Sequence, residues 1–433
     1  MKKFISLVLA VSMMMSIMIG CSKNETTGDV TTEVKVTTAD TETTTEAAKS
    51  EDPVEITFYT WSQLNGYPEN MVAAFEAANP DIKVNIEIGS QSVDEYLQMQ
   101  KVKFLSGEAI DVTTVRPEMR KEYVDAGYLL DLSDQQFLSN FNQSYLDMVA
   151  VDGKVYSAPY ALDVMGTIYN KTMFEENGWS VPTNQKEWLE LCDVISAAGI
   201  LPTINGYKDS WPILCEVAPF LHEVYVKDPE IFTKINNGEA KYTDANFVEA
   251  FTKINDFFHS SAVSKDVLGI GYDQSAADFA TGKAAMMVHG EWVVGSIKTA
   301  SPAFEIGVFP LLHNAEGGAL TGSVSIGQSN AVSALSQHPE ASLRFLEYIS
   351  SVEGATFFAN AMGNFTPVTG VKSDNMAIWE EVLKLPALDF YYNLQYPGAQ
   401  AEMQKMFQLM SIGEVTPEEA LENIQTEQDK KGQ

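Results

Sequence analysis

Strand and helix patterns alternate along residues 54–115, and this order constrains the fold more than any other feature of the sequence. The segments, in order, are a strand at 54–59, a helix at 68–78, a strand at 83–88, a helix from Ser92 to about residue 106, and a strand at 111–115. This order is typical of a parallel sheet covered by helices, so we predict an α/β fold.

Ligands of such sheets bind outside the carboxyl ends of the strands. Two loops follow predicted strands directly. One loop, residues 61–65, contains Trp61, Gln63 and Asn65, and the other, residues 116–118, contains Glu118. We therefore expect both loops to contribute side chains to a ligand site.

A second α/β region begins near Pro159-Tyr160. Its strand patterns lie at 165–169, 201–205, 284–288, 304–308 and 324–328, and its helical patterns at 185–198, 244–259 and 338–351. The helix at 244–259 is the clearest, because Phe247, Phe251 and Ile254 fall on one apolar face.

The first 21 residues have the order of an export signal. Lys2 and Lys3 precede an apolar run that ends at Ile19, and Gly20 and Cys21 follow. The run is shorter than the ~20 residues of a membrane-spanning helix. Its end resembles the lipobox of bacterial lipoproteins, in which the cysteine thiol carries lipid, although Met18 stands where leucine is usual. We predict a signal peptide at 1–20 and lipidation of Cys21; an ordinary secretory signal with a chance cysteine is the alternative.

Residues 21–52 have the composition of a spacer. Ten threonines and eight acidic residues occur between 22 and 52, with no aromatic residue. Such a segment cannot bury enough apolar surface to offset its chain entropy, so we expect a disordered linker between a membrane anchor and the folded part.

Charge and cysteine content exclude several classes of function. The formal net charge is −31, which argues against nucleic acid or an anionic surface as a partner. Besides Cys21 only Cys192 and Cys215 remain, and Cys192 falls in an apolar helical pattern, so a buried free thiol is expected rather than a disulfide. We predict no metal site and no cofactor.

The motifs of common enzymes are also missing. Gly282-Lys283 lacks the first glycine and the Ser/Thr of a phosphate loop, and Ser325 lacks the first glycine of a nucleophile elbow. A glycosidase needs only two suitably spaced acids, and no pair of acids in this sequence stands out. We therefore predict a binding protein rather than an enzyme.

Residues 279–292, FATGKAAMMVHGEW, are the most specific stretch of the folded part. They resemble the F-x-x-G-K-A-A-M-x-x-x-G-x-W segment of extracellular solute-binding proteins of the sugar-binding type (family 1), which serve ABC importers. Further similar segments follow the family order: 111–112 with 127–132, 153–160 with 168–174, and 416–421. The resemblance covers most of residues 54–425.

The resemblance implies a two-lobed periplasmic-binding-protein-like fold with a ligand cleft between the lobes, each lobe discontinuous in sequence. The first lobe is expected at 54–158 plus 302–362, and the second at 159–301 plus 363–433. It also implies a monomer, lipid-anchored at the extracellular face of the membrane, which delivers a carbohydrate to ABC permease subunits driven by a separate ATPase.

Aromatic residues at strand ends suit a carbohydrate, because flat rings cover the apolar faces of a sugar and polar groups bind its hydroxyl rim. In a helix that starts at Gly290, Val293, Val294 and Ile297 cluster, and Trp292 lies away from them. Trp188 and Trp379 follow helical apolar patterns and are expected in the core. The candidate ligand-binding residues are Trp61, Gln63, Asn65, Glu118, Tyr160, Asp163, Trp211, Glu291, Trp292, Gly322, Ser323 and Tyr391.

Several alternatives stay open at this point. The ligand could be a polyol, a glycerol phosphate or another small solute instead of an oligosaccharide. A phosphate would require two or more basic side chains at the site, and only Arg116 falls in a predicted site loop. A surface glycosidase and a sensory or adhesive lipoprotein are the alternatives from other functional classes.

Overall fold

The computed structural model of the chain describes residues 52–61, 66–90, 93–108, 110–204, 206–300, 302–372, 375–389 and 396–431. The predicted signal peptide, Cys21 and almost all of the predicted linker lie outside these residues. No helix in the described ranges is long and apolar enough to cross a membrane.

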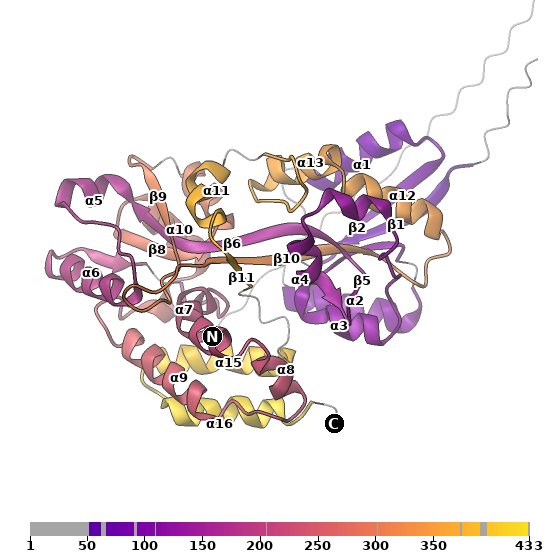
Figure 1. Cartoon of the computed structure of the whole chain (residues 1–433). Helices are drawn as coiled ribbons and strands as arrows, with labels where there is room; N and C mark the ends of the chain where they lie inside the picture. Colours follow the sequence, from indigo (N-terminus) through magenta and orange to yellow (C-terminus); the bar gives the residue numbers. More distant parts are fainter. Residues whose placement is uncertain are drawn as a thin grey trace, which may run out of the picture. The chain divides into compact units, whose positions relative to one another are not determined.

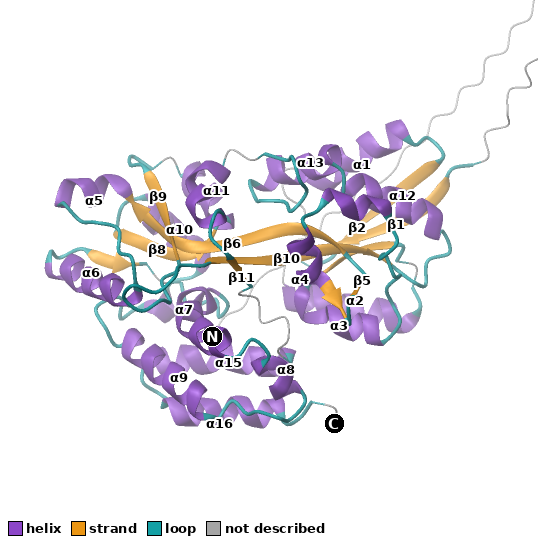
Figure 2. Ribbon diagram, viewed as in Figure 1, coloured by secondary structure: helices purple, strands orange, loops and turns teal. Residues whose placement is uncertain are grey.

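Nine strands form one mixed sheet in the described residues (Figures 1 and 2). They are β1 (Val54–Thr60), β2 (Ile82–Ile88), β3 (Val112–Val115), β6 (Ala158–Asn170), β7 (Leu201–Thr203), β8 (Ala284–Gly290), β9 (Ile306–Pro310), β10 (Gly322–Val332) and β11 (Ala387–Leu388). The strand order is β2-β1-β3-β10-β6-β8-β7, with β11 beside β10 and β9 beside β6. A separate pair consists of β4 (Ala150–Val151) and β5 (Lys154–Val155).

Helices connect these strands. In the first half of the chain they are α1 (Tyr67–Ala78), α2 (Val93–Ser106), α3 (Pro117–Asp125), η1 (Gln136–Asn140), α4 (Gln143–Val149), α5 (Lys171–Asn177), α6 (Gln185–Ala197) and α7 (Pro212–Lys227). In the second half they are α8 (Ile231–Asn236), α9 (Ala245–Phe258), η2 (Val267–Gly269), α10 (Tyr272–Ala280), α11 (Trp292–Thr299), α12 (Pro339–Ile349), α13 (Val352–Met362), η3 (Met376–Trp379), α14 (Glu380–Leu383), α15 (Pro397–Ser411) and α16 (Pro417–Gln428).

The alternating order predicted at the start of the folded part is confirmed. β1 pairs in parallel with both β2 and β3, so the carboxyl ends of β1 and β3 lie next to each other. Trp61 follows the first of these ends, and Arg116 follows the second.

Two long antiparallel strands, β6 and β10, carry the sheet from β3 to β8. Figure 2 shows them as the longest strands of the molecule. The strands predicted at 165–169 and 324–328 were too short, because the remaining residues of β6 and β10 pair with each other. A pairing between segments so distant in sequence leaves no local pattern.

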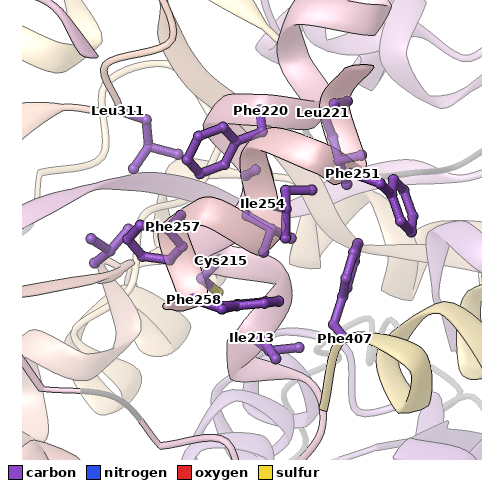
Figure 3. Close-up of a cluster of buried hydrophobic side chains, with 14 of the residues drawn as sticks. Ile213, Cys215, Phe220, Leu221, Phe251, Ile254, Phe257, Phe258, Leu311 and Phe407 are labelled. Carbon is purple, nitrogen blue, oxygen red and sulfur yellow. The ribbon is translucent and has the colours of Figure 1, made fainter. Parts of the chain in front are cut away.

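The core consists of several buried apolar clusters. The largest gathers side chains from α6, α7, α9, α15 and α16. Figure 3 shows part of it, with labelled side chains of α7, α9 and α15. Phe251 and Phe258 of α9 both pack against Phe407, with ring centroids 5.0 Å and 6.2 Å apart. Cys192 and Cys215 belong to this cluster as buried free thiols, as predicted.

The predicted lobe boundaries stay a prediction. Residues 302–362 were assigned to the first lobe together with 54–158. Within them, β9 pairs with β6, and Phe309, Leu311 and Leu312 belong to the same cluster as α7 and α9.

Candidate ligand-binding site

Four aromatic rings gather at the carboxyl end of β8. They belong to Trp211, Tyr272, His289 and Trp292, and we call them the aromatic cluster. The Trp211 ring lies 5.0 Å from Tyr272, 5.1 Å from His289 and 6.3 Å from Trp292, measured between centroids. Trp211 is 38% exposed, while His289 is buried. The cluster therefore contains an accessible indole, Trp211, that packs against a buried ring, His289.

The backbone around Gly290 explains the position of Trp292. Val293, Val294 and Ile297 are fully buried, and Trp292 is only partly buried, as the helical pattern predicted. A Cβ atom on Gly290 would lie 2.0 Å from the Trp292 ring. Glycine is therefore required before Glu291, because the indole folds back over the end of the strand.

His289 supports the cluster as a neutral ring. Its Nδ1 atom accepts a hydrogen bond from the backbone N–H of Gly290 at 2.9 Å, and burial lowers its pKa to about 3. A neutral imidazole that accepts at Nδ1 carries its proton at Nε2. This Nε2 atom finds no partner among the described residues.

Two acidic side chains lie beside the aromatic cluster. Asp163 on β6 is 6% exposed, and a Cβ atom on Gly327 would lie 1.9 Å from its Oδ2 atom. Asp163 pairs with Ser325 across the strands, so both side chains lie on one face of the sheet. Their neighbours Leu162, Val164, Val324 and Ile326 belong to a core cluster on the other face. Glu291 is fully buried and accepts a hydrogen bond from the N–H of Val164 at 2.9 Å.

A second group of side chains lies at the ends of β1 and β3. The Arg116 guanidinium lies over the Trp61 ring, 5.3 Å from its centroid, and forms an ion pair with Glu118 at 3.2 Å. In the described part of the chain, Trp61 Nε1 and Glu118 Oε2 are buried atoms without a hydrogen-bond partner. This group is therefore a second, polar part of the candidate site.

Arg120 links this group to Asp163. Its Nη1 atom donates to the carbonyl of Met148 at 3.1 Å, and burial lowers its pKa to about 10, against the opposing charges of Asp389 and Glu118. Asp389 accepts a hydrogen bond from Ser325 Oγ at 2.6 Å, and Ser325 is the cross-strand partner of Asp163. Polar groups thus continue from Glu118 to the aromatic cluster.

The remaining candidate residues do not share one position. Tyr160 is buried in the core between Tyr67 and Phe358, at centroid distances of 6.1 Å and 4.5 Å. Gly322 and Ser323 pair with Ala387 and Leu388, where β11 joins β10, and Ser323 also pairs with Met165, two residues after Asp163 on β6. Gln63, Asn65 and Tyr391 lie outside the described residues. Trp188 and Trp379 are core residues, as predicted.

Four site residues were not identified from the sequence: Arg120, Tyr272, His289 and Asp389. His289 lies inside the most specific stretch, which could have drawn attention to it. Tyr272 follows Gly271 at the first position of α10, a weak signal of a helix start. Arg120 and Asp389 carry no local signal, because only the fold brings their charges together. Within the described residues no group of three or more potential ligands could hold a metal ion.

Comparisons with known proteins place the chain in a family. Residues 70–387 match the family model described as bacterial extracellular solute-binding protein. The chain is similar to the Multiple sugar-binding protein of Streptococcus mutans, with 27% identity over 355 residues, covering 79% of this chain and 82% of that protein.

Solved structures have the same two-lobed fold. RafE from Streptococcus pneumoniae superimposes with a TM-score of 0.70 and 23% identity, over 87% of this chain and 97% of that one. A sugar transporter protein from Bacillus licheniformis, in complex with stachyose, gives 0.69 and 18%, over 86% and 99%. The chain belongs to the family of bacterial extracellular solute-binding proteins.

Proposed function

We propose that this protein captures a carbohydrate, most specifically an oligosaccharide, between the aromatic cluster and the polar groups around Asp163 and Glu118. Members of its family are solute-binding components of transport systems and not enzymes. The observation that carries the proposal is the aromatic cluster beside a poorly exposed carboxylate. Trp211 and Trp292 offer ring faces for the C–H faces of a sugar, and Asp163 offers an acceptor for its hydroxyl groups.

Relatives support this ligand class. The similar protein of Streptococcus mutans is named for binding several sugars, and solved structures of this fold hold raffinose, maltose or stachyose. These sugars are neutral, differ in length, and are the natural first probes for this chain.

The charges at the site favour a neutral ligand over a phosphate. Arg116 forms an ion pair with Glu118. Arg120 interacts electrostatically with Asp389 and Glu118. Both guanidinium groups therefore face acids, so little positive charge is left for an anion. A glycerol phosphate ligand remains the second candidate and is included in the test.

We further propose that Cys21 carries lipid and that residues 22–52 tether the protein near its partner. In this scheme the loaded protein, a monomer at the extracellular face of the membrane, delivers its ligand to ABC permease subunits powered by a separate ATPase. The basic, apolar and Gly-Cys order of residues 2–21 supports the anchor. Metabolic labelling with a palmitate analogue tests it, because a Cys21→Ala variant should lose the label.

A ligand screen tests the carbohydrate assignment. We expect raffinose, stachyose or maltose to raise the melting temperature with the logarithm of ligand excess. The variant Trp292→Ala should lose this shift, and Trp179→Ala, another partly buried indole outside the aromatic cluster, should keep it. A shift with glycerol 3-phosphate and none with sugars would refute the proposal.

A cleavage assay separates binding from hydrolysis. We expect each sugar to be recovered intact after prolonged incubation with the protein. Release of shorter sugars, lost on substitution of Asp163, would instead identify a glycosidase.

A further inference from the structure

The carboxyl group of Glu291 ties two elements of the proposed site together. Its Oε2 atom accepts a hydrogen bond from the N–H of Val164, and its own backbone N–H donates to the carbonyl of Val164, both at 2.9 Å. Val164 follows Asp163 directly on β6, and Trp292 follows Glu291 directly at the start of α11. These two bonds therefore fix the indole of Trp292 relative to the carboxylate of Asp163.

We propose that Glu291 is a positioning residue for ligand binding, which holds Trp292 and Asp163 in register without contacting the ligand itself. This inference rests on the proposed function. It gives Glu291 a different role from the direct contact expected from the sequence. The fully buried position of Glu291 supports it, because a group with 0% exposure presents no surface to a ligand.

The surroundings of the Glu291 carboxyl favour its protonated form. Burial raises the pKa of the Glu291 carboxyl well above its ordinary value, the charge of Asp163 raises it further, and the N–H of Val164 acts in the opposite direction. The titratable groups that face this position are Asp163 on β6, Tyr272 on α10, His289 on β8 and, beside Asp163, Cys215 on α7.

None of these facing groups is a cation at neutral pH, since burial also lowers the pKa of His289 to about 3. Two neighbouring buried carboxyl groups cannot both ionise at low cost. In the proposed arrangement, Glu291 holds the proton of this pair.

Two variants test whether the hydrogen bond between Glu291 and Val164 is needed for ligand binding. Glu291→Gln keeps an oxygen acceptor for Val164 and is neutral, so we expect its affinity for raffinose or stachyose at pH 7 to stay within about threefold of wild type. Glu291→Met has a similar volume and cannot accept, which leaves the buried N–H of Val164 unpaired. We expect it to bind about tenfold more weakly or worse, because the Trp292 indole is then no longer held in place relative to Asp163. Isothermal titration calorimetry gives both constants.

The pH profile is the second measurement of the binding test. Wild-type affinity should fall with rising pH, because ionisation of Glu291 places a negative charge beside Asp163. The affinity of Glu291→Gln should stay level over the same range. Equal weakening in Glu291→Gln and Glu291→Met, or wild-type affinity in Glu291→Met, would overturn the proposal.

A ligand-free measurement keeps this inference separate from the carbohydrate assignment. The raised pKa means that the folded state holds a proton that the unfolded state has lost, so stability should fall as pH rises above about 4.5. The unfolding equilibrium constant of the wild type should therefore increase with pH, by up to about tenfold per unit, relative to that of Glu291→Gln. Parallel curves would refute the neutral carboxyl. If no sugar binds the wild type, the proposed function fails while this comparison still decides the state of Glu291.

Discussion

At the scale of single residues, Gly290 controls the aromatic cluster. A methyl group there would meet the Trp292 ring at 2.0 Å, so Gly290→Ala must displace the indole. We expect the variant to fold and to bind sugar about tenfold more weakly or worse, since about 1.4 kcal/mol of lost contact corresponds to tenfold. Gly269→Ala is the matched control, because nothing lies within 4 Å of its added Cβ. Titration calorimetry compares the two, and equal affinities would contradict this account of Trp292.

The buried imidazole of His222 predicts a loss of stability in acid. Burial lowers its pKa to about 3, with the charge of His313 acting in the same direction, and neither ring nitrogen has a partner among the described residues. Between about pH 3 and 6.5 the unfolded state binds the extra proton, so the unfolding free energy should decrease as pH falls through this range.

Denaturant titrations at several pH values check this prediction. His222→Leu should reduce the slope of the unfolding free energy against pH by up to about 1.4 kcal/mol per pH unit, which is the value for one proton. His338→Gln, at an exposed position, serves as the control for the loss of one histidine. An equal slope in His222→Leu and wild type would show that His222 does not titrate in this way.

The residues of the site differ in how far the sequence could indicate them. The helical pattern around Trp292 predicted that its indole avoids the apolar stripe, and the patterns around Trp188 and Trp379 predicted core positions. Arg120 and Asp389 lie 269 positions apart in the sequence and interact through their charges. Such a pair depends on tertiary structure, so no periodicity or spacing could reveal it.

At the scale of elements, the final helix shows a local signal with a measurable consequence. Thr416 Oγ1 accepts from the N–H of Glu419 at 3.2 Å, and Glu419 Oε2 accepts from the N–H of Thr416 at 2.9 Å. Loss of this capping box in Thr416→Ala should lower the unfolding free energy by about 1 kcal/mol. Thr426→Ala, within the same helix, should have a smaller effect, and neither variant should change sugar affinity. Urea unfolding of both variants checks whether Thr416→Ala loses more stability than Thr426→Ala.

The same scale shows where sequence patterns stop being sufficient. α1, β2 and α9 match their predicted ranges closely, because each has a local apolar period of 3.6 or 2 residues. β6 and β10 extend well beyond their predicted ranges. Asp163 interrupts the apolar pattern of β6 just before its predicted range, while Ser325 and Gly327 lie inside the range predicted for β10.

At the scale of the whole molecule, the two-lobed fold predicts a change on ligand binding. Two lobes that share a ligand close by a hinge motion, because the closed form gains contacts on both sides of the ligand. The proposed site draws on both predicted lobes, with Trp61 and Glu118 from 54–158 and Trp292 from 159–301. We therefore expect the radius of gyration from small-angle X-ray scattering to decrease when stachyose or raffinose saturates the protein. Trp292→Ala should show no decrease at the same sugar concentration, while Trp179→Ala should behave as wild type. An unchanged radius in a wild-type sample that calorimetry shows to be saturated would contradict hinge closure, even with sugar binding intact.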